Sequence, residues 1–103
     1  MKIQTRTGEG IAEVIGEKRE RVLELARQQG VFNVRIFGSV ARGEATPDSD
    51  VDFIVDGLEN AVWGGGRLLM ELQTLLGRQI DLVSVNDLHP LMRDQVLKEA
   101  IPL

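Results

Sequence analysis

The chain has 103 residues, and its 12 basic and 16 acidic residues give a formal net charge of -4 at pH 7. With 43% hydrophobic and 27% charged residues, the composition predicts one folded domain, residues 1–103, and argues against disorder. The negative net charge disfavours a surface that wraps nucleic acid, because such a surface needs a basic stripe. A long polynucleotide is therefore a poor candidate for the ligand.

No apolar run approaches the roughly 20 residues that span a bilayer. The N-terminal segment from Met1 to Arg6 lacks the apolar core of a signal peptide. The chain also contains no cysteine, which removes disulfides and thiolate metal sites and fits a reducing compartment. We therefore expect a cytoplasmic protein with no membrane partner, in which metal ligands would be oxygen atoms or the single histidine.

The first predicted element is an amphipathic helix over residues 10–29. Apolar residues recur there at steps of three, four and seven, which is the period of one helix face. The charges between them alternate in sign, so we interpret the charged run as a solvated face and not as a basic patch. Gly30 ends this helix. Residues 31–37 follow as a strand, because the segment carries β-branched and aromatic residues and ends at a glycine.

The next elements are separated by turn residues. Pro47 and its neighbours form a turn that reverses the chain, so residues 51–55 are predicted to pair with the first strand in an antiparallel, hairpin-like manner. Leucines on one side of residues 68–76 indicate a second helix that ends at Gly77. The segment 64–66, three glycines before that helix, could be a second anion nest, but a flexible connector is the simpler interpretation.

The last third of the chain predicts one more strand and one more helix. Residues 78–85 alternate enough to form a third strand with two distinct faces, and residues 87–100 carry apolar residues at helical spacing. Pro90 is tolerated because it falls in the first turn of this helix. The predicted order is helix, strand, short helix, strand, helix, strand, helix.

A candidate phosphate-binding turn begins where the first strand stops. Gly38 has no Cβ, so backbone can approach a ligand closely there, and Ser39 offers a hydroxyl at the start of a short helical turn. Arg42 lies one helical turn further on, where its forked donors can neutralise phosphate charge. The same residue types also make ordinary tight bends, so this turn is weak evidence when taken alone.

Three carboxylates carry the stronger signal. Asp50 and Asp52 are two residues apart in an apolar stretch with strand character, so both side chains would leave the same face. Two crowded carboxylates repel each other unless a cation lies between them, and magnesium is commonly held by carboxylates together with substrate phosphates. Asp81 lies on a separate predicted strand and could converge with the pair if the two strands are neighbours.

Such a triad suits nucleotidyl transfer. Three carboxylates can hold two magnesium ions, one on a triphosphate and one on the attacking hydroxyl, for an in-line displacement at phosphorus. In this scheme Asp50 and Asp52 bind both ions, while Asp81 binds the second ion and helps to remove the hydroxyl proton. The alternative is that Asp50 caps a turn and Asp52 lies on a solvated strand face.

Two other residues have weaker claims. His89 precedes Pro90 near a helix start, away from any other predicted ligand, so a surface or capping role is favoured. Trp63 stands beside the three glycines and could stack on a base, although a partly buried anchor or a partner contact is equally compatible with its position.

The motif resembles the nucleotidyltransferase superfamily that includes DNA polymerase beta. The signature of that superfamily is Gly-Ser, ten residues, Asp-x-Asp and a later Asp, and it is matched by Gly38, Ser39, Asp50, Asp52 and Asp81. The resemblance implies an α/β fold of the α+β type, with a mixed three-stranded sheet in the order 1-2-3 packed with helices. It also implies magnesium-dependent transfer of a nucleoside monophosphate with release of pyrophosphate.

The fuller strings GSVARG and SDVDFIV are similar to the minimal nucleotidyltransferase branch, whose members are often encoded beside a HEPN-domain protein. This resemblance implies ATP as the substrate and a HEPN toxin as the partner in a hetero-oligomer. Some members of the branch are antitoxins that transfer AMP to a tyrosine of the toxin, and others neutralise it mainly by binding. Because this chain contains no tyrosine, a tyrosine acceptor must lie on another protein.

Three functions follow from the resemblance. The first is an active adenylyltransferase that serves as the antitoxin of a HEPN pair, and the second is a binding module that blocks its partner by contact. The third, nucleotide transfer to a small molecule, needs an acceptor domain that we do not find in the sequence. The base pocket and the acceptor site can be completed by a partner or by a second copy in a homodimer.

Overall fold

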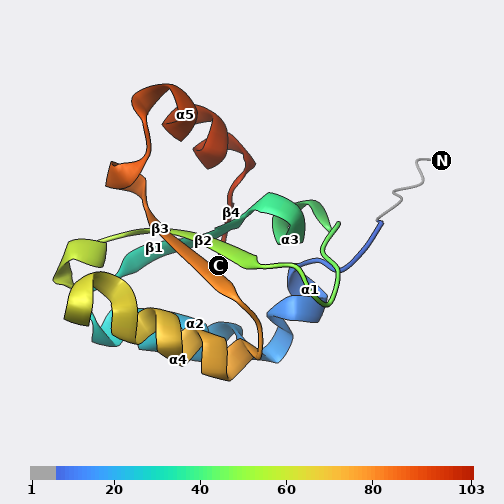
Figure 1. The fold of residues 1–103 in the computed structure, drawn as a ribbon, viewed down its shortest axis with the longest axis horizontal. Coiled ribbons are helices and arrows are strands. Elements are labelled where there is room, and N and C mark those ends of the chain that lie inside the picture. Colours follow the sequence, from blue (N-terminus) through green and yellow to red (C-terminus); the bar gives the residue numbers. More distant parts are fainter. Residues whose placement is uncertain (1–6) are drawn as a thin grey trace.

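The computed structural model describes residues 7–103, so the segment Met1 to Arg6, which lacks a signal-peptide core, lies outside the described residues. Helices and strands alternate along most of the chain (Figure 1). In chain order the elements are α1 (Ile11–Val14), α2 (Arg19–Gln28), β1 (Phe32–Phe37), α3 (Gly38–Arg42), β2 (Val51–Asp56), α4 (Gly66–Leu76), β3 (Ile80–Ser84), α5 (Pro90–Glu99) and β4 (Ile101–Pro102).

The strands form one mixed sheet in the order β3-β2-β1-β4. β1 pairs antiparallel with β2, as predicted from the turn at residues 46–48, and β2 pairs parallel with β3. The parallel pair is reached through α4, because parallel neighbours need a crossover connection. The α+β class and the order of the first three strands are therefore confirmed.

The sheet has a fourth strand, so the prediction of three strands was wrong by one. β4 pairs antiparallel with β1 through Arg35 opposite Pro102 and Ile36 opposite Ile101. A strand of two residues is too short to show an alternating pattern, and one of the two is a proline. It forms because the end of α5 returns the chain to the free edge of β1, which is a tertiary cause.

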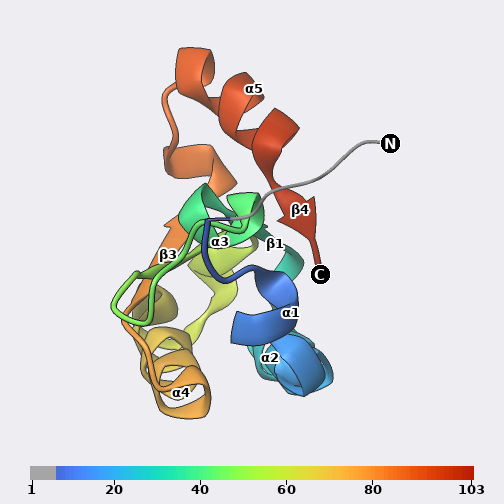
Figure 2. The same ribbon diagram turned by 90° about the vertical axis from the view of Figure 1, so that its right-hand side faces the viewer.

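The hydrophobic core lies between the sheet and the pair α2 and α4, which run side by side under one face (Figures 1 and 2). Alternate strand residues point into it, among them Ile36 and Phe53, both 0% exposed. Leu68 and Leu72 of α4 meet them from below and are also fully buried. The side chains between these positions leave the opposite face of the sheet, and that face carries the polar residues.

The predicted long helix over residues 10–29 is broken in the structure. α1 ends at Val14, a 3-10 turn covers Gly16–Lys18, and α2 begins at Arg19. Gly16 has a φ of 49°, which is the left-handed region that glycine adopts at little cost. The hydrophobic period continues across this break, so periodicity alone did not reveal it.

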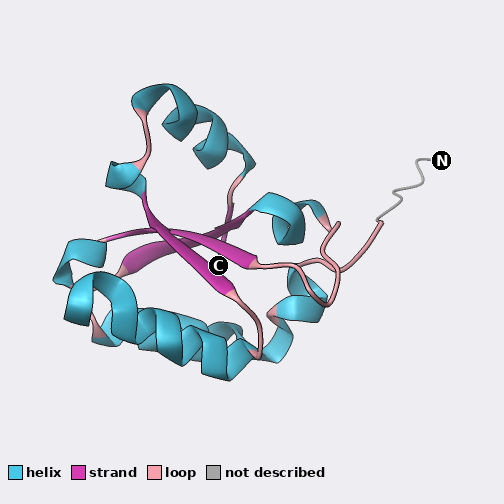
Figure 3. Ribbon diagram, in the orientation of Figure 1, coloured by secondary structure: helices cyan, strands magenta, loops and turns pink. Residues whose placement is uncertain are grey.

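The final helix, α5, lies on the opposite side of the sheet from α2 and α4 (Figure 3). None of its residues is buried, and Leu91 is 83% exposed. Its apolar residues predicted an amphipathic helix over residues 87–100, and the structure places α5 at Pro90–Glu99. Within residues 7–103, no helix has both the length and the apolar content needed to cross a membrane.

Candidate active site

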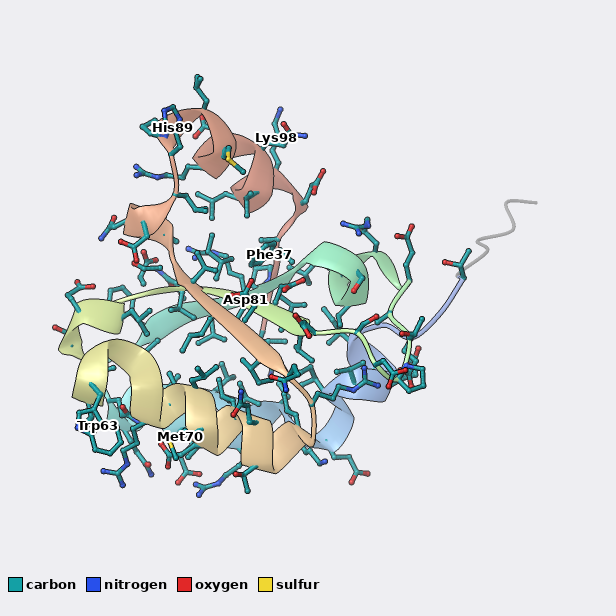
Figure 4. All side chains as sticks on the ribbon, in the orientation of Figure 1. Phe37, Trp63, Met70, Asp81, His89 and Lys98 are labelled. Atoms are coloured by element: carbon teal, nitrogen blue, oxygen red, sulfur yellow. The ribbon has the colours of Figure 1, made fainter. Side chains whose placement is uncertain are left out.

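The sheet brings two of the three predicted carboxylates together. Asp52 on β2 is directly opposite Asp81 on β3 in the parallel ladder. Neighbouring strands lie about 4.8 Å apart, and paired residues turn their side chains to the same face. Both carboxylates therefore leave the face that is opposite to the core, as Figure 4 shows for the labelled Asp81. The prediction that these strands are neighbours is confirmed.

The candidate phosphate-binding turn lies on the other side of Asp52. Phe37, the last residue of β1, is opposite Asp52 in the antiparallel ladder, and α3 begins at the next residue, Gly38. Gly38 has a φ of 73°, and a Cβ built on it would press into the Asp52 carboxylate. The absence of a side chain at Gly38 therefore makes room for Asp52 beside the backbone of α3, and Ser39 follows directly.

Like charges and burial act together on Asp52. Burial raises the pKa of the Asp52 carboxyl above its usual range, and the charges of Asp81 and then Asp50 raise it further, while Arg42 opposes the shift. Neighbouring carboxylates raise each other's pKa because both resist ionising in one place. Such a perturbed group in a polar cluster is a common mark of a functional site.

Asp50 precedes β2 and is exposed, at the end of a loop that other parts of the chain hold in place. The Ser49 hydroxyl accepts a hydrogen bond from the Thr46 N–H at 2.8 Å. Arg78, two residues before β3, donates to the Thr46 carbonyl at 2.9 Å and also pairs with Glu9. Arg78 therefore joins the N-terminal segment, this loop and β3, which fixes the segment that carries Asp50.

Arg42, the third residue of the predicted phosphate site, is exposed and donates from Nε to Glu44 Oε2 at 2.9 Å. Its pKa is raised mainly by this hydrogen bond to Glu44, with smaller contributions from Glu99 and Asp52. Arg42 thus lies within the electrostatic reach of Asp52, on the same side of the molecule. The role of Glu44 was not predicted, because the sequence indicated a helical turn there, and side chains two residues apart do not face each other on a helix.

A second polar group occupies the far end of the same sheet face. Asp56, at the end of β2, accepts hydrogen bonds at Oδ2 from Asn33 Nδ2 at 2.8 Å and Arg35 Nη2 at 3.3 Å. The β1–β2 register shifts between Phe32 and Arg35, and Asn33 has a φ of 50°, as in a β-bulge. The sequence did not single out this pair, because a bulge is not visible in the alternating pattern.

The carboxylates fit a divalent cation, although their side chains do not form a ready cage. Within residues 7–103, no group of three or more acidic or histidine side chains is arranged closely enough to hold an ion. The fit rests on the chemistry of the donors: Asp52 and Asp81 share one face, and the charges of Asp50 and Asp81 both raise the pKa of Asp52. A hard cation with oxygen ligands would relieve that repulsion, and the exposed Asp50 lies two residues before Asp52.

The other predicted residues lie elsewhere. The prediction of a capping role for His89 is confirmed, since His89 Nδ1 accepts a hydrogen bond from the Leu91 N–H at 3.2 Å at the start of α5. Gly64 and Gly65 both have positive φ and belong to a 3-10 turn, Val62–Gly65, that leads into α4. Trp63, in the same turn, is 75% exposed, so it is not a partly buried anchor.

A large cavity of the described residues lies away from the carboxylates. It is a groove of about 610 Å³ on the outer surface of α2 and α4, and its lining includes Arg21, Leu25, Trp63 and Met70. The sheet separates it from Asp52, and Figure 4 shows Trp63 and Met70 below the sheet beside α4. A base bound next to the carboxylates therefore could not stack on Trp63. We take the carboxylate face as the candidate site because charge, register and backbone geometry converge there.

A glycine-led turn beside paired carboxylates on neighbouring strands defines a nucleotide-transferring class of domain. A family model described as a nucleotidyltransferase domain matches residues 17–103. This chain belongs to the nucleotidyltransferase domain family.

Curated relatives are similar over most of the chain. A candidate protein adenylyltransferase of Methanocaldococcus jannaschii, MJ0435, is 35% identical over 88 residues, which are 84% of this chain and 95% of that protein. The protein adenylyltransferase MntA of Thermococcus cleftensis is 39% identical over 79 residues, which are 76% of this chain and 80% of that protein.

Solved structures agree with the fold. The structure of a candidate minimal nucleotidyltransferase has a TM-score of 0.79 and 48% identity, and the match covers 88% of this chain and 94% of that chain. A crystal structure of a toxin-antitoxin complex with AMP-PNP has a TM-score of 0.66 and 21% identity, over 81% of this chain and 69% of that chain. The second likeness supports the fold alone.

Proposed function

We propose that this protein is a magnesium-dependent protein adenylyltransferase that serves as an antitoxin by transferring AMP from ATP to a HEPN toxin. One observation carries the proposal: Asp52 and Asp81 lie opposite each other on neighbouring strands, and Gly38 places the start of α3 against the Asp52 carboxylate. The relatives MJ0435 and MntA are named as protein adenylyltransferases, which supports transfer of an adenylyl group to a protein acceptor. The proposal takes residues 1–103 as one minimal domain that acts in the cytoplasm, where ATP is available.

The nucleotide would bind across the end of β1. In this assignment the backbone of Gly38 and the Ser39 hydroxyl hold the triphosphate at the start of α3, where unpaired N–H groups face an anion. Arg42 neutralises phosphate charge after it exchanges its contact with Glu44 for the nucleotide. Because Arg42 is exposed, this exchange costs little.

The carboxylates would hold the metal and the proton. Asp50, Asp52 and Asp81 are the ligands that we assign to two Mg²⁺ ions, which when bound neutralise the phosphates and make the attacking hydroxyl more acidic. Asp81 also accepts the hydroxyl proton, since it is the exposed residue of β3. The proposed acceptor is a side chain of another protein, because the chain contains no tyrosine.

The exposed helix α5 supports a protein partner. Leu91 and Met92 are 83% and 58% exposed, and no residue of α5 is buried. Apolar side chains gathered on an uncovered helix are typical of a protein–protein contact. The same observation favours the alternative function, an antitoxin that blocks the HEPN toxin by binding without transferring AMP. Transfer to a small molecule has no such support.

The decisive experiment is intact mass spectrometry of the HEPN partner after incubation with this protein, ATP and Mg²⁺. We expect mass increments of one or more AMP groups, and we expect none with a variant that carries both Asp50→Asn and Asp52→Asn. Complex formation by that variant, measured by size-exclusion chromatography, is the matched control. Neutralisation of the toxin without any increment, or by the double variant, would show that binding is the mechanism.

A further inference from the structure

One long edge of the sheet is unpaired, and it is the edge that carries Asp81. In the described residues β3 is the last strand of the order β3-β2-β1-β4, so only β2 pairs with it. The opposite edge differs, because β4 occupies part of the edge of β1. The turn around Thr46 is hydrogen-bonded to Arg78, which lies two residues before β3. Among residues 7–103, the edge from Ile80 to Ser84 therefore has no neighbouring strand.

The direction of the backbone groups on this edge follows from one hydrogen bond. The Val51 N–H donates to the Gln79 carbonyl at 2.9 Å, so Gln79 turns its backbone groups toward β2. Backbone groups alternate in direction along a strand, so Asp81 and Val83 also turn toward β2. Ile80, Leu82 and Ser84 must then present their N–H and C=O groups outward. This is the arrangement that accepts an added strand.

The side from which an acceptor approaches follows from the order of the groups across the sheet. The start of α3 lies beyond the end of β1, Asp52 lies on β2 and Asp81 lies on β3. An in-line displacement puts the attacking and leaving oxygens on opposite sides of the phosphorus. If the leaving pyrophosphate lies over α3, the attacking hydroxyl comes from the side of β3. That is the side on which the sheet has its free edge.

We propose that the free edge of β3 is the acceptor site, where an extended polypeptide segment binds as an added strand and places a hydroxyl side chain beside Asp81. The inference rests on the proposed function and names its acceptor geometry. An added strand would lie about 4.8 Å from β3, so a side chain in register with Asp81 shares the carboxylate face. A tyrosine ring rises further above a sheet than an aspartate side chain does, which suits attack on a phosphorus held above the carboxylates.

The step is balanced without further reactants. The acceptor oxygen forms a bond to the α-phosphorus of ATP, and the bond from that phosphorus to the bridging oxygen of pyrophosphate breaks. The acceptor proton goes to the Asp81 carboxylate and then to solvent. The products are an AMP ester of the acceptor and pyrophosphate, and nothing is oxidised or reduced.

The test uses synthetic tyrosine peptides, labelled ATP and Mg²⁺. We expect the protein to label a subset of peptides, and we then methylate the backbone nitrogens of the best peptide one at a time. Methylation at every second residue should lower labelling at least about tenfold, because each removes a hydrogen bond to β3, whereas methylation between them should not. The positions of the sensitive residues relative to the tyrosine show whether the added strand is parallel or antiparallel to β3. Uniform sensitivity, or none, would overturn the proposal.

The protein side of the same contact is tested at Leu82. Leu82→Pro removes an outward N–H without removing a hydrogen bond to β2, and Leu82→Ala is the matched control, because both variants lose the side chain that packs on the core. We expect labelling by Leu82→Pro to be at least about tenfold below that by Leu82→Ala, with equal binding of Mg-ATP. Equal labelling by the two variants would overturn the proposal, and if Leu82→Pro does not fold, the methylation pattern decides.

The two proposals fail in different ways. If the wild-type protein binds Mg-ATP but labels no peptide, the extended-segment acceptor is wrong while a transferase that recognises a folded acceptor survives. If the wild-type protein does not bind Mg-ATP at all, the proposed function itself is wrong.

Discussion

The two faces of the sheet consist of side chains from the same strands, but these side chains differ in polarity and in burial between the faces. On the face covered by α2 and α4, most strand residues are apolar, and many, such as Val34, Ile36 and Phe53, are almost wholly buried. On the opposite face, the intervening residues include Arg35, Asp52 and Asp81. Because side chains alternate along a strand, adjacent residues of one strand lie on opposite faces, one apolar and covered, the other partly polar.

The difference shows which residues fold the protein and which are candidates to carry its chemistry. The covered face is stabilised by removing apolar surface from water. The opposite face, called here the open face, contains unfavourable interactions, since the pKa of Asp52 is raised by burial and by the charges of Asp81 and Asp50. A site that costs stability in this way is expected where a ligand later offsets the cost. Substitutions on the two faces test this contrast.

The largest effect on stability is expected on the covered face. Phe53 is 0% exposed in the centre of β2, so Phe53→Ala should lower the free energy of unfolding by about 3–5 kcal/mol through lost burial and an unfilled cavity. Chemical denaturation measures the change. Phe32→Ala is the control, because Phe32 is 55% exposed on β1, and a comparable loss there would contradict the contrast.

The next effect concerns the neighbouring residue on the open face. Asp52→Asn should lower AMP transfer by about 100-fold or more, because a metal ligand is worth several kcal/mol in the transition state, and it should raise stability at neutral pH. The sign follows from the pKa of Asp52, which is higher in the folded protein than its ordinary value. The folded state then holds the proton more tightly than the unfolded chain, so wild-type stability falls as pH rises through that raised pKa.

Thermal unfolding across pH, with transfer assays beside it, checks both parts. The variant should lack this part of the pH dependence. Asp56→Asn is the matched control, since Asp56 lies on the same face but pairs with Arg35 and Asn33. The Asp56→Asn variant should be less stable than the wild-type protein and should retain its AMP-transfer activity. A destabilised Asp52→Asn protein would show that the charges around Asp52 help the fold instead of opposing it.

A smaller effect is expected at the glycine that faces Asp52. Gly38→Ala and Gly77→Ala both place an alanine at positive φ, 73° and 65°, which costs about 1–2 kcal/mol each. Only at Gly38 would the new Cβ press on the Asp52 carboxylate, since nothing lies within 4 Å at Gly77. Mg-ATP binding, measured by calorimetry, should therefore weaken about 10–100-fold in Gly38→Ala and stay unchanged in Gly77→Ala. Equal affinities would remove Gly38 from the site.

The smallest effect is expected beyond the covered face, at Trp63. This residue is 75% exposed and has a φ of 56°, so Trp63→Gly removes little packing and relieves an unfavourable backbone conformation. We expect a change in unfolding free energy within about 0.5 kcal/mol and no change in Mg-ATP binding, because the sheet lies between Trp63 and the carboxylates. A weaker affinity for Mg-ATP would place the nucleotide base on the α2–α4 side.

Much of the fold could be predicted because its signals are local. The turn containing Pro47 predicted the antiparallel pairing of β1 and β2, and Gly77, with a φ of 65°, ends α4 as expected. The break at Gly16 and the strand β4 could not be predicted. Gly16 lies within an uninterrupted hydrophobic period, and Ile101–Pro102 becomes a strand only because β1 offers an edge.

The candidate site residues and their spacing follow from the amino-acid sequence alone. The resemblance to the nucleotidyltransferase superfamily rests on Gly38, Ser39, Asp50, Asp52 and Asp81 in their order along the chain. Tertiary structure decided what those residues do to one another: β-sheet register set Asp52 opposite Asp81, and the backbone of Gly38 closed against Asp52. It also decided which edge of the sheet stays open, because strand order depends on contacts between segments far apart in the chain, and no local pattern encodes it.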